Sequence, residues 1–380
     1  MSESLRSLIA DHTMAAAPEL VRPDVLDSIR CLACGHRCVI YEGLEGICKV
    51  RFHRDGELRV PAGYVAGLQV DPIEKKPFFH AFPGQEALSF GMLGCDLHCS
   101  YCQNWITSQA LRDDHAVSDT HHITAERAVE LAVHNRVPVI VSTYNEPLIT
   151  SEWAVQIFRR AREHGIACGY VSNGNGTREV LEFLRPHVDL YKVDLKGFRD
   201  RPYRSLGGVL QVVLDTISML YEMKFWTEVV TLVVPGFNDS DEELRDIARF
   251  LVGVSPDIPW HVTAFHPNYK MDTTPSTPVK TLIRAYDIGR EEGLHFVYPG
   301  NLPGRVGDRE NTLCPDCGEL LIERQGFYVR SNRLEEGACP KCSRSIAGFW
   351  GSRTARTSVG PGTPRPATGS PSPSRHEPCG

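Results

Sequence analysis

The chain has 380 residues, and 42% of them are hydrophobic, so it can form one large domain with smaller modules around a sizeable core. Its formal net charge of −6 gives no indication of binding to nucleic acid or to an anionic membrane. No run of 18 apolar residues exists, and the first 20 residues lack a basic start followed by an apolar run. We therefore expect no membrane span, no signal peptide and a cytoplasmic protein.

Thirteen cysteines in a chain of this kind indicate metal ligands rather than disulfides. Most of them fall into three separate groups along the sequence. Of the two left over, Cys168 lies in an apolar run and is expected to be a small buried core residue. Cys379 lies near the C-terminus, where we expect it to have no role.

The first cysteine group follows a leader of residues 1–22 and belongs to a Cys-rich metal-binding segment, residues 23–60. Its four thiols are Cys31, Cys34, Cys38 and Cys48. Nearby glycines permit a tight knuckle, so we favour a structural zinc ion, with a second iron–sulfur cluster as the alternative. The spacing differs from that of ferredoxins, which argues against a role in electron relay.

The second group is the CxxxCxxC triplet Cys95, Cys99 and Cys102, with aromatic Tyr101 before its last cysteine. Thiolates are the usual ligands of iron–sulfur clusters, and three of them leave one iron of a four-iron cluster open to a small molecule. The alternative is a zinc site in which His98 is the fourth ligand.

Short apolar runs alternate with amphipathic segments from about residue 86 to residue 300. The runs expected to be strands are 88–92, 138–143, 166–172, 188–194, 226–234, 260–265 and 295–298. Residues 151–165 and 278–293 have helical periodicity, and Ser240 with Glu243 reads as a capping box that opens a further helix. Six βα units and a last strand favour a partial (β/α)6 barrel over residues 61–300, with a doubly wound open sheet as the second choice.

Polar motifs follow these runs at the ends where barrel enzymes place their active sites. They are the cysteine triplet, TYNEP (143–147), SNGNG (172–176), DLK (194–196), VVPGFND (233–239), FHPNY (265–269) and YPGN (298–301). Ordinary turns would account for one or two such motifs but not for seven. The sequence therefore predicts one site built from the carboxyl ends of the strands.

The third group consists of two CxxC pairs, Cys314 with Cys317 and Cys339 with Cys342. Two knuckles at this spacing, with apolar hairpin sequence between them, predict a rubredoxin-like ribbon over residues 301–351 that binds zinc in preference to iron. The final residues, 352–380, are rich in Pro, Gly, Ser and Thr, and we expect a disordered tail there.

Together these segments resemble the radical S-adenosylmethionine (SAM) enzymes of the AmmeMemoRadiSam system, which are similar to pyruvate formate-lyase activating enzymes. The resemblance runs from about residue 25 to residue 351. The segments that carry it include CLACGHRCVIYEGLEGICKVR (31–51), DPIEKKPFFHAFPG (71–84), the triplet, TYNEP, VDLKGF (193–198) and PWHVTAFHPNYKM (259–271). It implies a [4Fe–4S] cluster on the triplet, whose fourth iron is chelated by SAM.

The resemblance also implies SAM-binding residues at the strand ends. Glu146 would meet the SAM amino group, and Ser172 and Asn173 would lie near its ribose and carboxylate. The remaining candidates for SAM contact are Tyr101, Asn145, Asp194, Lys196 and His266. Val171 stands where activating enzymes have an acidic residue of a cation site, which argues against activator-type peptide recognition.

The expected function is that of a radical SAM oxidoreductase. It would reductively cleave SAM to a 5′-deoxyadenosyl radical that abstracts hydrogen from a protein or small-molecule substrate. The resemblance implies a reductant such as flavodoxin or ferredoxin, and Memo-like and Amme-like companion proteins; no nucleic acid or membrane partner is expected. The alternatives are an activating enzyme of a glycyl-radical enzyme, and a non-enzymatic zinc-ribbon adaptor with a vestigial barrel.

Overall fold

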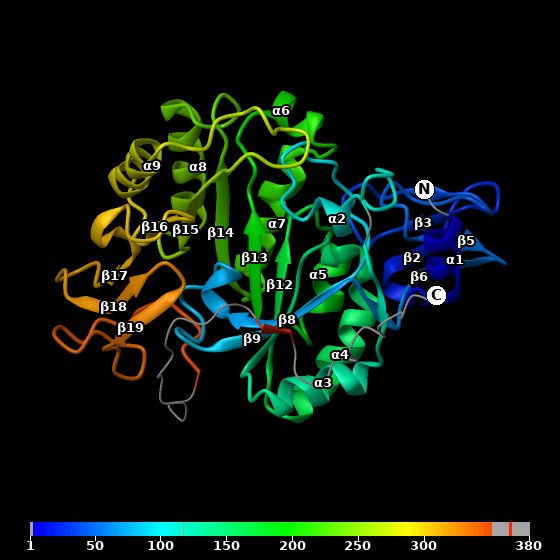
Figure 1. The fold of residues 1–380 in the computed structure, drawn as a ribbon, viewed down its shortest axis with the longest axis horizontal. Helices are drawn as coiled ribbons and strands as arrows, with labels where there is room; N and C mark the ends of the chain where they lie inside the picture. Colours follow the sequence, from blue (N-terminus) through cyan, green and yellow to red (C-terminus); the bar gives the residue numbers. More distant parts are fainter. Residues whose placement is uncertain (1–2, 117, 352–364, 367–380) are drawn as a thin grey trace, which may run out of the picture.

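The computed structural model describes residues 3–116, 118–351 and 365–366. Within these ranges no helix is both long and apolar enough to cross a membrane. The central element is a large sheet, with two small three-stranded sheets formed by the N-terminal residues on one side and a third formed by the late cysteine region on the other (Figure 1).

The large sheet contains seven parallel strands in sequential order. They are β9 (Glu86–Gly91), β11 (Val139–Ser142), β12 (Ala167–Ser172), β13 (Leu190–Asp194), β14 (Trp226–Val233), β15 (Trp260–Ala264) and β16 (Val297–Gly300). All seven expected strands are therefore present, and the α/β fold is confirmed. A doubly wound sheet reverses its strand order part-way, and this sheet does not, so the second choice is wrong.

Helices connect the successive parallel strands. They are α3 (Ala125–His134), α4 (Ser151–Glu163), α5 (Arg178–Leu184), α6 (Asp200–Ser205), α7 (Leu210–Glu222), α8 (Asp241–Val254) and α9 (Val279–Glu291). Ser240 caps α8 by accepting the backbone N–H of Glu243, as expected. The Glu243 carboxylate, however, accepts the N–H of Phe198 rather than that of Ser240, so only half of the capping box forms.

Both faces of the parallel strands are buried, which explains why their sequences are mostly apolar. In β11, Ile140 packs into the main core with the helices, whereas Val139 and Val141 face a second core cluster. That second cluster includes Ile73, Phe78 and Ala81, from the segment before β9. Residues 73–81 therefore pack on the face of the sheet opposite the helices.

Of the remaining elements, β8 (Gly67–Pro72) joins the large sheet as an antiparallel neighbour of β9, and most of the others lie around the sheet. Around the N-terminal cysteines lie α1 (Glu3–Asp11), β1 (Thr13–Ala15), η1 (Pro18–Leu20), β2 (Val21–Pro23), β3 (Ile29–Cys31), β4 (Val39–Ile40), β5 (Phe52–Arg54), β6 (Glu57–Pro61) and β7 (Tyr64–Val65). The connections near the triplet contain β8, η2 (Ile73–Lys75), α2 (Trp105–Ser108), β10 (His121–His122) and η3 (Pro147–Thr150). The late region contains η4 (Gly307–Glu310), β17 (Thr312–Leu313), β18 (Leu320–Gln325) and β19 (Tyr328–Asn332).

The expected disordered tail, residues 352–380, lies almost entirely outside the described residues. The exception is β20 (Arg365–Pro366), which pairs antiparallel with β8. Cys379 also lies outside the described residues.

Candidate functional site

A cavity of about 390 Å³ lies at the carboxyl ends of the parallel strands. Cys95, Cys99 and Cys102 line it, and so do side chains from the ends of β11, β12 and β13. The expected site residues that line it with the thiols are Tyr101, Asn145, Glu146, Ser172, Asn173, Asp194 and Lys196. The structure thus brings these candidates together in one place, as barrel topology predicts.

The loop that carries the triplet is held by its glycine and by polar contacts to sulfur. Gly94 has a φ of +93°, and a Cβ there would lie 2.8 Å from Val50 and 3.1 Å from the Cys48 carbonyl, so the loop passes close against the N-terminal segment. The N–H of Leu97 lies 3.4 Å from the Cys95 sulfur, and Cys102 Sγ lies 3.1 Å from Ser108 Oγ.

The three thiols fit a multi-iron cluster better than a single ion. A tetrahedral zinc site holds sulfur atoms about 2.3 Å from the metal and hence close together. Among the described residues, however, the triplet is not a group of ligand atoms that lie within 4.8 Å of one another. His98 is exposed and its ring lies against Gly207, outside the cavity lining, so it does not complete a zinc site with these thiols.

Burial and nearby carboxylates disfavour the thiolate forms of the triplet. Burial raises the pKa of Cys99 to about 11, although the nearby Lys196 ammonium acts in the opposite direction. Burial, with the Asp96 and Glu146 carboxylates nearby, holds the pKa of Cys95 well above its usual range. A cationic iron–sulfur core bound by these sulfurs would stabilise their thiolate forms.

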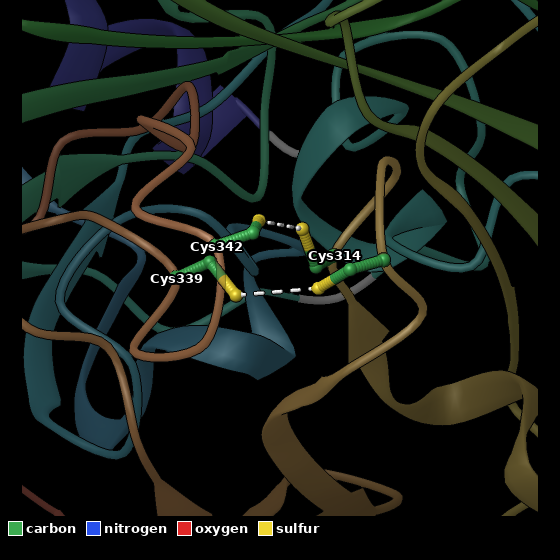
Figure 2. Close-up of side chains that lie close together, drawn as sticks. Cys314, Cys339 and Cys342 are labelled. Carbon is green, nitrogen blue, oxygen red and sulfur yellow. Dashed lines mark hydrogen bonds between the residues drawn. The ribbon is translucent and has the colours of Figure 1, made fainter.

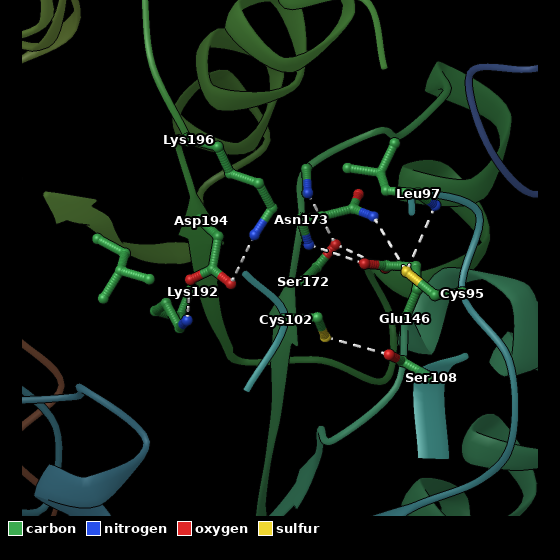
Figure 3. A network of polar contacts seen from close by, with 12 residues as sticks. Cys95, Leu97, Cys102, Ser108, Glu146, Ser172, Asn173, Lys192, Asp194 and Lys196 are labelled. Atoms are coloured by element: carbon green, nitrogen blue, oxygen red, sulfur yellow. Dashed lines mark hydrogen bonds and ion pairs between the residues drawn. The ribbon is translucent and has the colours of Figure 1, made fainter. Parts of the chain in front are cut away.

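Glu146 is a buried carboxylate at the start of η3 that three donors hold in place. Its oxygens accept the Ser172 hydroxyl at 2.7 Å, the Asn173 N–H at 2.7 Å and the Leu148 N–H at 3.1 Å. Figure 3 shows Glu146, Ser172 and Asn173 beside Cys95. Burial and the nearby Asp96 raise the pKa of Glu146 to about 8, so a cation in the cavity would favour its ionised form.

Asp96 is a site residue that the sequence analysis missed. Its buried carboxylate accepts the side-chain amides of Asn173 and Asn175, each at 2.7 Å. It thereby ties the triplet loop to the polar segment that follows β12. Its position directly after Cys95 was visible in the sequence, but a single acidic residue in a loop carries no signal for such a role.

A second polar group lies across the cavity on β13. Asp194 is paired with both Lys192 and Lys196, and Figure 3 shows the carboxylate between the two ammonium groups. These two charges lower the pKa of Asp194 despite its burial. Lys192 was not among the sequence-based candidates, although the alternation Lys192, Asp194, Lys196 places all three on one face of an extended chain.

The other sequence-based candidates occupy different surroundings. Asn145 binds the backbone through its amide, which accepts the Met92 N–H at 3.0 Å. Tyr101 is buried and its ring packs against Phe237. His266 is exposed, lies near Ser276 and the Asn301 carbonyl, and is not among the described residues that line the cavity.

The late cysteines form a compact tetrathiolate group, as the two CxxC pairs predict. The sulfurs of Cys314, Cys317, Cys339 and Cys342 all lie within 4.8 Å of one another (Figure 2). The donor set and spacing fit one tetrahedral metal ion, and a four-sulfur set leaves no open position for catalysis. Cys314, Cys339 and Ile346 also share a core cluster with Tyr298 of β16, so the knuckles pack against the large sheet.

The N-terminal cysteines are less tightly gathered. Within the described part of the chain, Cys31, Cys34, Cys38 and Cys48 do not form a group of ligand atoms within 4.8 Å. Backbone N–H groups do point at their sulfurs: that of His36 at Cys34, that of Ile47 at Cys38 and that of Val50 at Cys48. Burial nevertheless raises the pKa of Cys34, Cys38 and Cys48, against the effect of these donors. A metal site here stays a prediction.

Cys168, in contrast, is fully buried in the main core away from these groups, as expected.

Comparisons with known proteins relate this chain to one superfamily of enzymes. A model of the Radical SAM superfamily matches residues 91–251. An uncharacterized protein of Methanocaldococcus jannaschii, MJ0808, is 37% identical over 324 residues, which cover 84% of this chain and 95% of that protein. The pyruvate formate-lyase-activating enzyme of Clostridium pasteurianum is 25% identical over 181 residues, which cover 45% of this chain and 71% of the enzyme.

Among solved structures, that of Streptococcus suis SuiB matches with a TM-score of 0.45 and 14% sequence identity. The match covers 60% of this chain and 52% of SuiB.

Proposed function

Because this chain belongs to the radical SAM superfamily, we propose that Cys95, Cys99 and Cys102 hold a [4Fe–4S] cluster whose open iron binds SAM. The observation that carries the proposal is that three spread thiols and the buried Glu146 open into one cavity at the strand ends. When bound, the cluster and SAM supply reductive cleavage of the sulfonium to methionine and a 5′-deoxyadenosyl radical that abstracts hydrogen from a substrate.

The chain's own residues would bind and orient SAM. Glu146 would accept the SAM amino group in a charge-assisted hydrogen bond, and Ser172 and Asn173, whose hydroxyl and backbone N–H donate to Glu146, would lie near the same end of the ligand. Lys196 offsets the negative charge of the thiolates, since its ammonium already acts on Cys99. The other proposed SAM contacts are Tyr101, Asn145, Asp194 and, at the rim beside Asn301, His266.

The rest of the chain would support this centre. We assign residues 1–22 to a leader, 23–60 to a metal-binding segment, 61–300 to a partial (β/α)6 barrel, 301–351 to a rubredoxin-like zinc ribbon and 352–380 to a tail. The N-terminal thiols would hold zinc or a second iron–sulfur cluster. The protein would act in the cytoplasm as an oxidoreductase, take electrons from flavodoxin or ferredoxin and work beside the Memo-like and Amme-like proteins of the AmmeMemoRadiSam system.

A second candidate is the activation of a glycyl-radical enzyme, which the similarity to a pyruvate formate-lyase-activating enzyme favours. Val171 argues against it, because this apolar side chain lines the cavity where activating enzymes place an acidic residue. Activity as a radical SAM enzyme would be common to both candidates, and the substrate would separate them.

The test is SAM cleavage by the anaerobically reconstituted, dithionite-reduced chain. We expect slow formation of 5′-deoxyadenosine and methionine without substrate, and none from a Cys95→Ala/Cys99→Ala/Cys102→Ala variant. A Cys168→Ala variant is the matched control, since this thiol lies in the core away from the cavity. A wild-type protein that bears a cluster and never cleaves SAM would refute the proposal and leave the adaptor interpretation.

A further inference from the structure

The cavity lining contains more ammonium groups than carboxylates. Lys75, Lys76, Lys192 and Lys196 line the cavity, whereas Asp194 and Glu146 are the carboxylates among its described lining residues. Behind Lys75 and Lys76 lies one buried carboxylate, Asp71, whose oxygens are 3.4 Å and 3.1 Å from the two Nζ atoms.

Two of these lysines are almost completely buried. The exposed fraction is 4% for Lys76 and 4% for Lys192. Burial lowers the pKa of Lys76 to about 8, and the charges of Lys75 and Lys192 act in the same direction, against the attraction of Asp71. Cations held together in a concave, partly dry site create a positive potential that an anion relieves.

The thiolates of the proposed iron–sulfur cluster do not balance all of the positive charge of these lysines. Lys196 is the lysine whose charge acts on the Cys99 thiol, whereas Lys75 and Lys192 act on Lys76. Lys192 and Lys196 share Asp194, and Lys75 and Lys76 share Asp71. Once Lys196 is assigned to the thiolates, Asp194 balances Lys192 and Asp71 balances one of Lys75 and Lys76, so one positive charge remains at this lysine group.

An aromatic side chain from the cysteine-rich C-terminal region lines the same cavity. Phe327 lies at the turn between β18 and β19, and 38% of it is exposed. The Glu310 carboxylate fixes this turn by accepting the N–H groups of Gly304 at 3.2 Å and Gly326 at 3.1 Å. Gly326 has a φ of +59°, and a Cβ there would lie 2.8 Å from Pro303, so the turn is braced against the neighbouring loop.

We propose that the part of the cavity lined by these lysines and Phe327 is the substrate subsite and that it takes a small organic anion, a carboxylate or a phosphate with an apolar body. The anionic group would lie among Lys75, Lys76 and Lys192, and the apolar part would lie against Phe327. The lysines and Phe327 line the same cavity as the three thiols, so a substrate held there would lie beside SAM. The inference rests on the proposed function, in which SAM binds the cluster that the thiols hold.

The experiment is anaerobic calorimetric titration of the full-length, cluster-reconstituted, SAM-loaded protein with four probes: phenyl phosphate, phenylacetate, inorganic phosphate and a glutamate-rich peptide. We expect saturable binding of phenyl phosphate or phenylacetate, and the tighter of the two identifies the anionic group. Lys75→Gln and Lys76→Gln should each weaken that binding about tenfold or more, as loss of a charge-assisted contact predicts. Phe327→Ala should weaken binding of phenyl phosphate more than that of inorganic phosphate.

Lys280→Gln is the matched control, because Lys280 is an exposed lysine on α9 outside the cavity lining. Lys76→Gln also loses a buried ion pair, so the half-exposed Lys75 supplies the variant that should fold normally, and the thermal midpoint of each variant is recorded. The inference would be overturned if neither organic anion showed saturable binding, or if Lys75→Gln and Lys280→Gln bound the anion with equal affinity. It would also be overturned if the glutamate-rich peptide bound more tightly than both organic anions. Wild-type SAM cleavage, measured separately, shows whether the proposed function stands when this inference fails.

Discussion

Glu146 combines two roles in one side chain. It starts η3 by accepting the Leu148 N–H, and it also lines the cavity beside Cys95. A carboxylate that only capped a turn would gain little from burial with Ser172 and Asn173 as donors, since burial raises its pKa. Its position therefore favours a bound cation as a further partner.

We predict that Glu146→Gln weakens SAM binding by about tenfold to a hundredfold, because a charge-assisted hydrogen bond contributes about 1.5–3 kcal/mol. The cluster absorbance should stay intact. SAM titration and the thermal midpoint are measured on the same sample. Glu243→Gln is the matched control, since its carboxylate also accepts a backbone N–H but lies outside the cavity lining. An unchanged SAM affinity with a lowered midpoint in Glu146→Gln would show that Glu146 only caps the turn.

The sequence was informative about residues where spacing alone implies chemistry. The metal-binding roles of the triplet and of the two CxxC pairs could be predicted from the sequence, because neighbouring thiols in each motif are separated by only two or three residues. The contacts of Asp96 with Asn173 and Asn175, and the positions of Lys76 and Phe327 at the cavity, could not be predicted, because they depend on packing between segments far apart in the chain. His266 follows β15 as expected but lies exposed, since the course of a loop beyond a strand end is not encoded in the strand pattern.

At the scale of elements, the seven strands were predictable because burial on both faces makes each a short apolar run. The segment over residues 73–81 was not, although it packs on the face of the sheet opposite the helices and places Lys75 and Lys76. Its sequence has no helical or strand period, so its position is set by the space that the sheet leaves.

The ribbon should depend on one zinc ion for its stability. We expect metal analysis of the full chain to give about one zinc at the late cysteines, and a Cys339→Ala/Cys342→Ala variant to lose it and to have a lower thermal midpoint, because site and fold form together. The triplet cluster should still assemble in this variant. An iron-loaded ribbon, or an unchanged midpoint after the zinc is lost, would contradict the prediction.

A buried ion pair joins the N-terminal segment to α4. Arg51 donates to both oxygens of Glu152 at 2.7 Å, and the exposed fractions of the two side chains are 1% and 2%. Arg51→Met should destabilise the protein by about 3–5 kcal/mol, because it leaves an unpaired buried carboxylate. Arg51→Met/Glu152→Met should recover much of this loss in urea unfolding. A double variant as unstable as Arg51→Met alone would show that the pair itself stabilises the fold.

At the scale of the whole molecule, His80 connects the large sheet to the ribbon. Its ring nitrogens lie 2.7 Å from the Ala347 carbonyl and 2.6 Å from the Tyr298 hydroxyl. Burial lowers the pKa of His80 to about 4. The neutral ring therefore contributes stability that is fully present above about pH 6.5 and is lost as the pH falls towards 4.

We predict that acid destabilises the protein across this range and that His80→Gln reduces the slope of the free energy of unfolding against pH. The lowered pKa of His80 corresponds to a loss of about 3 kcal/mol in the free energy of unfolding between a pH above 6.5 and a pH below 4. Urea unfolding at several pH values between 4 and 7 measures the slope for both proteins. Equal slopes would show that groups other than His80 control the response to acid.

The most direct test of the account is electron paramagnetic resonance of the anaerobically reduced protein with and without SAM. We predict a [4Fe–4S] signal in the wild type and in Cys168→Ala that changes shape when SAM is added, because SAM binds the iron that the three thiolates leave open. The Cys95→Ala/Cys99→Ala/Cys102→Ala variant should lack this signal. A cluster signal that ignores SAM, or one that persists at full intensity in the triple variant, would contradict the assignment of the site.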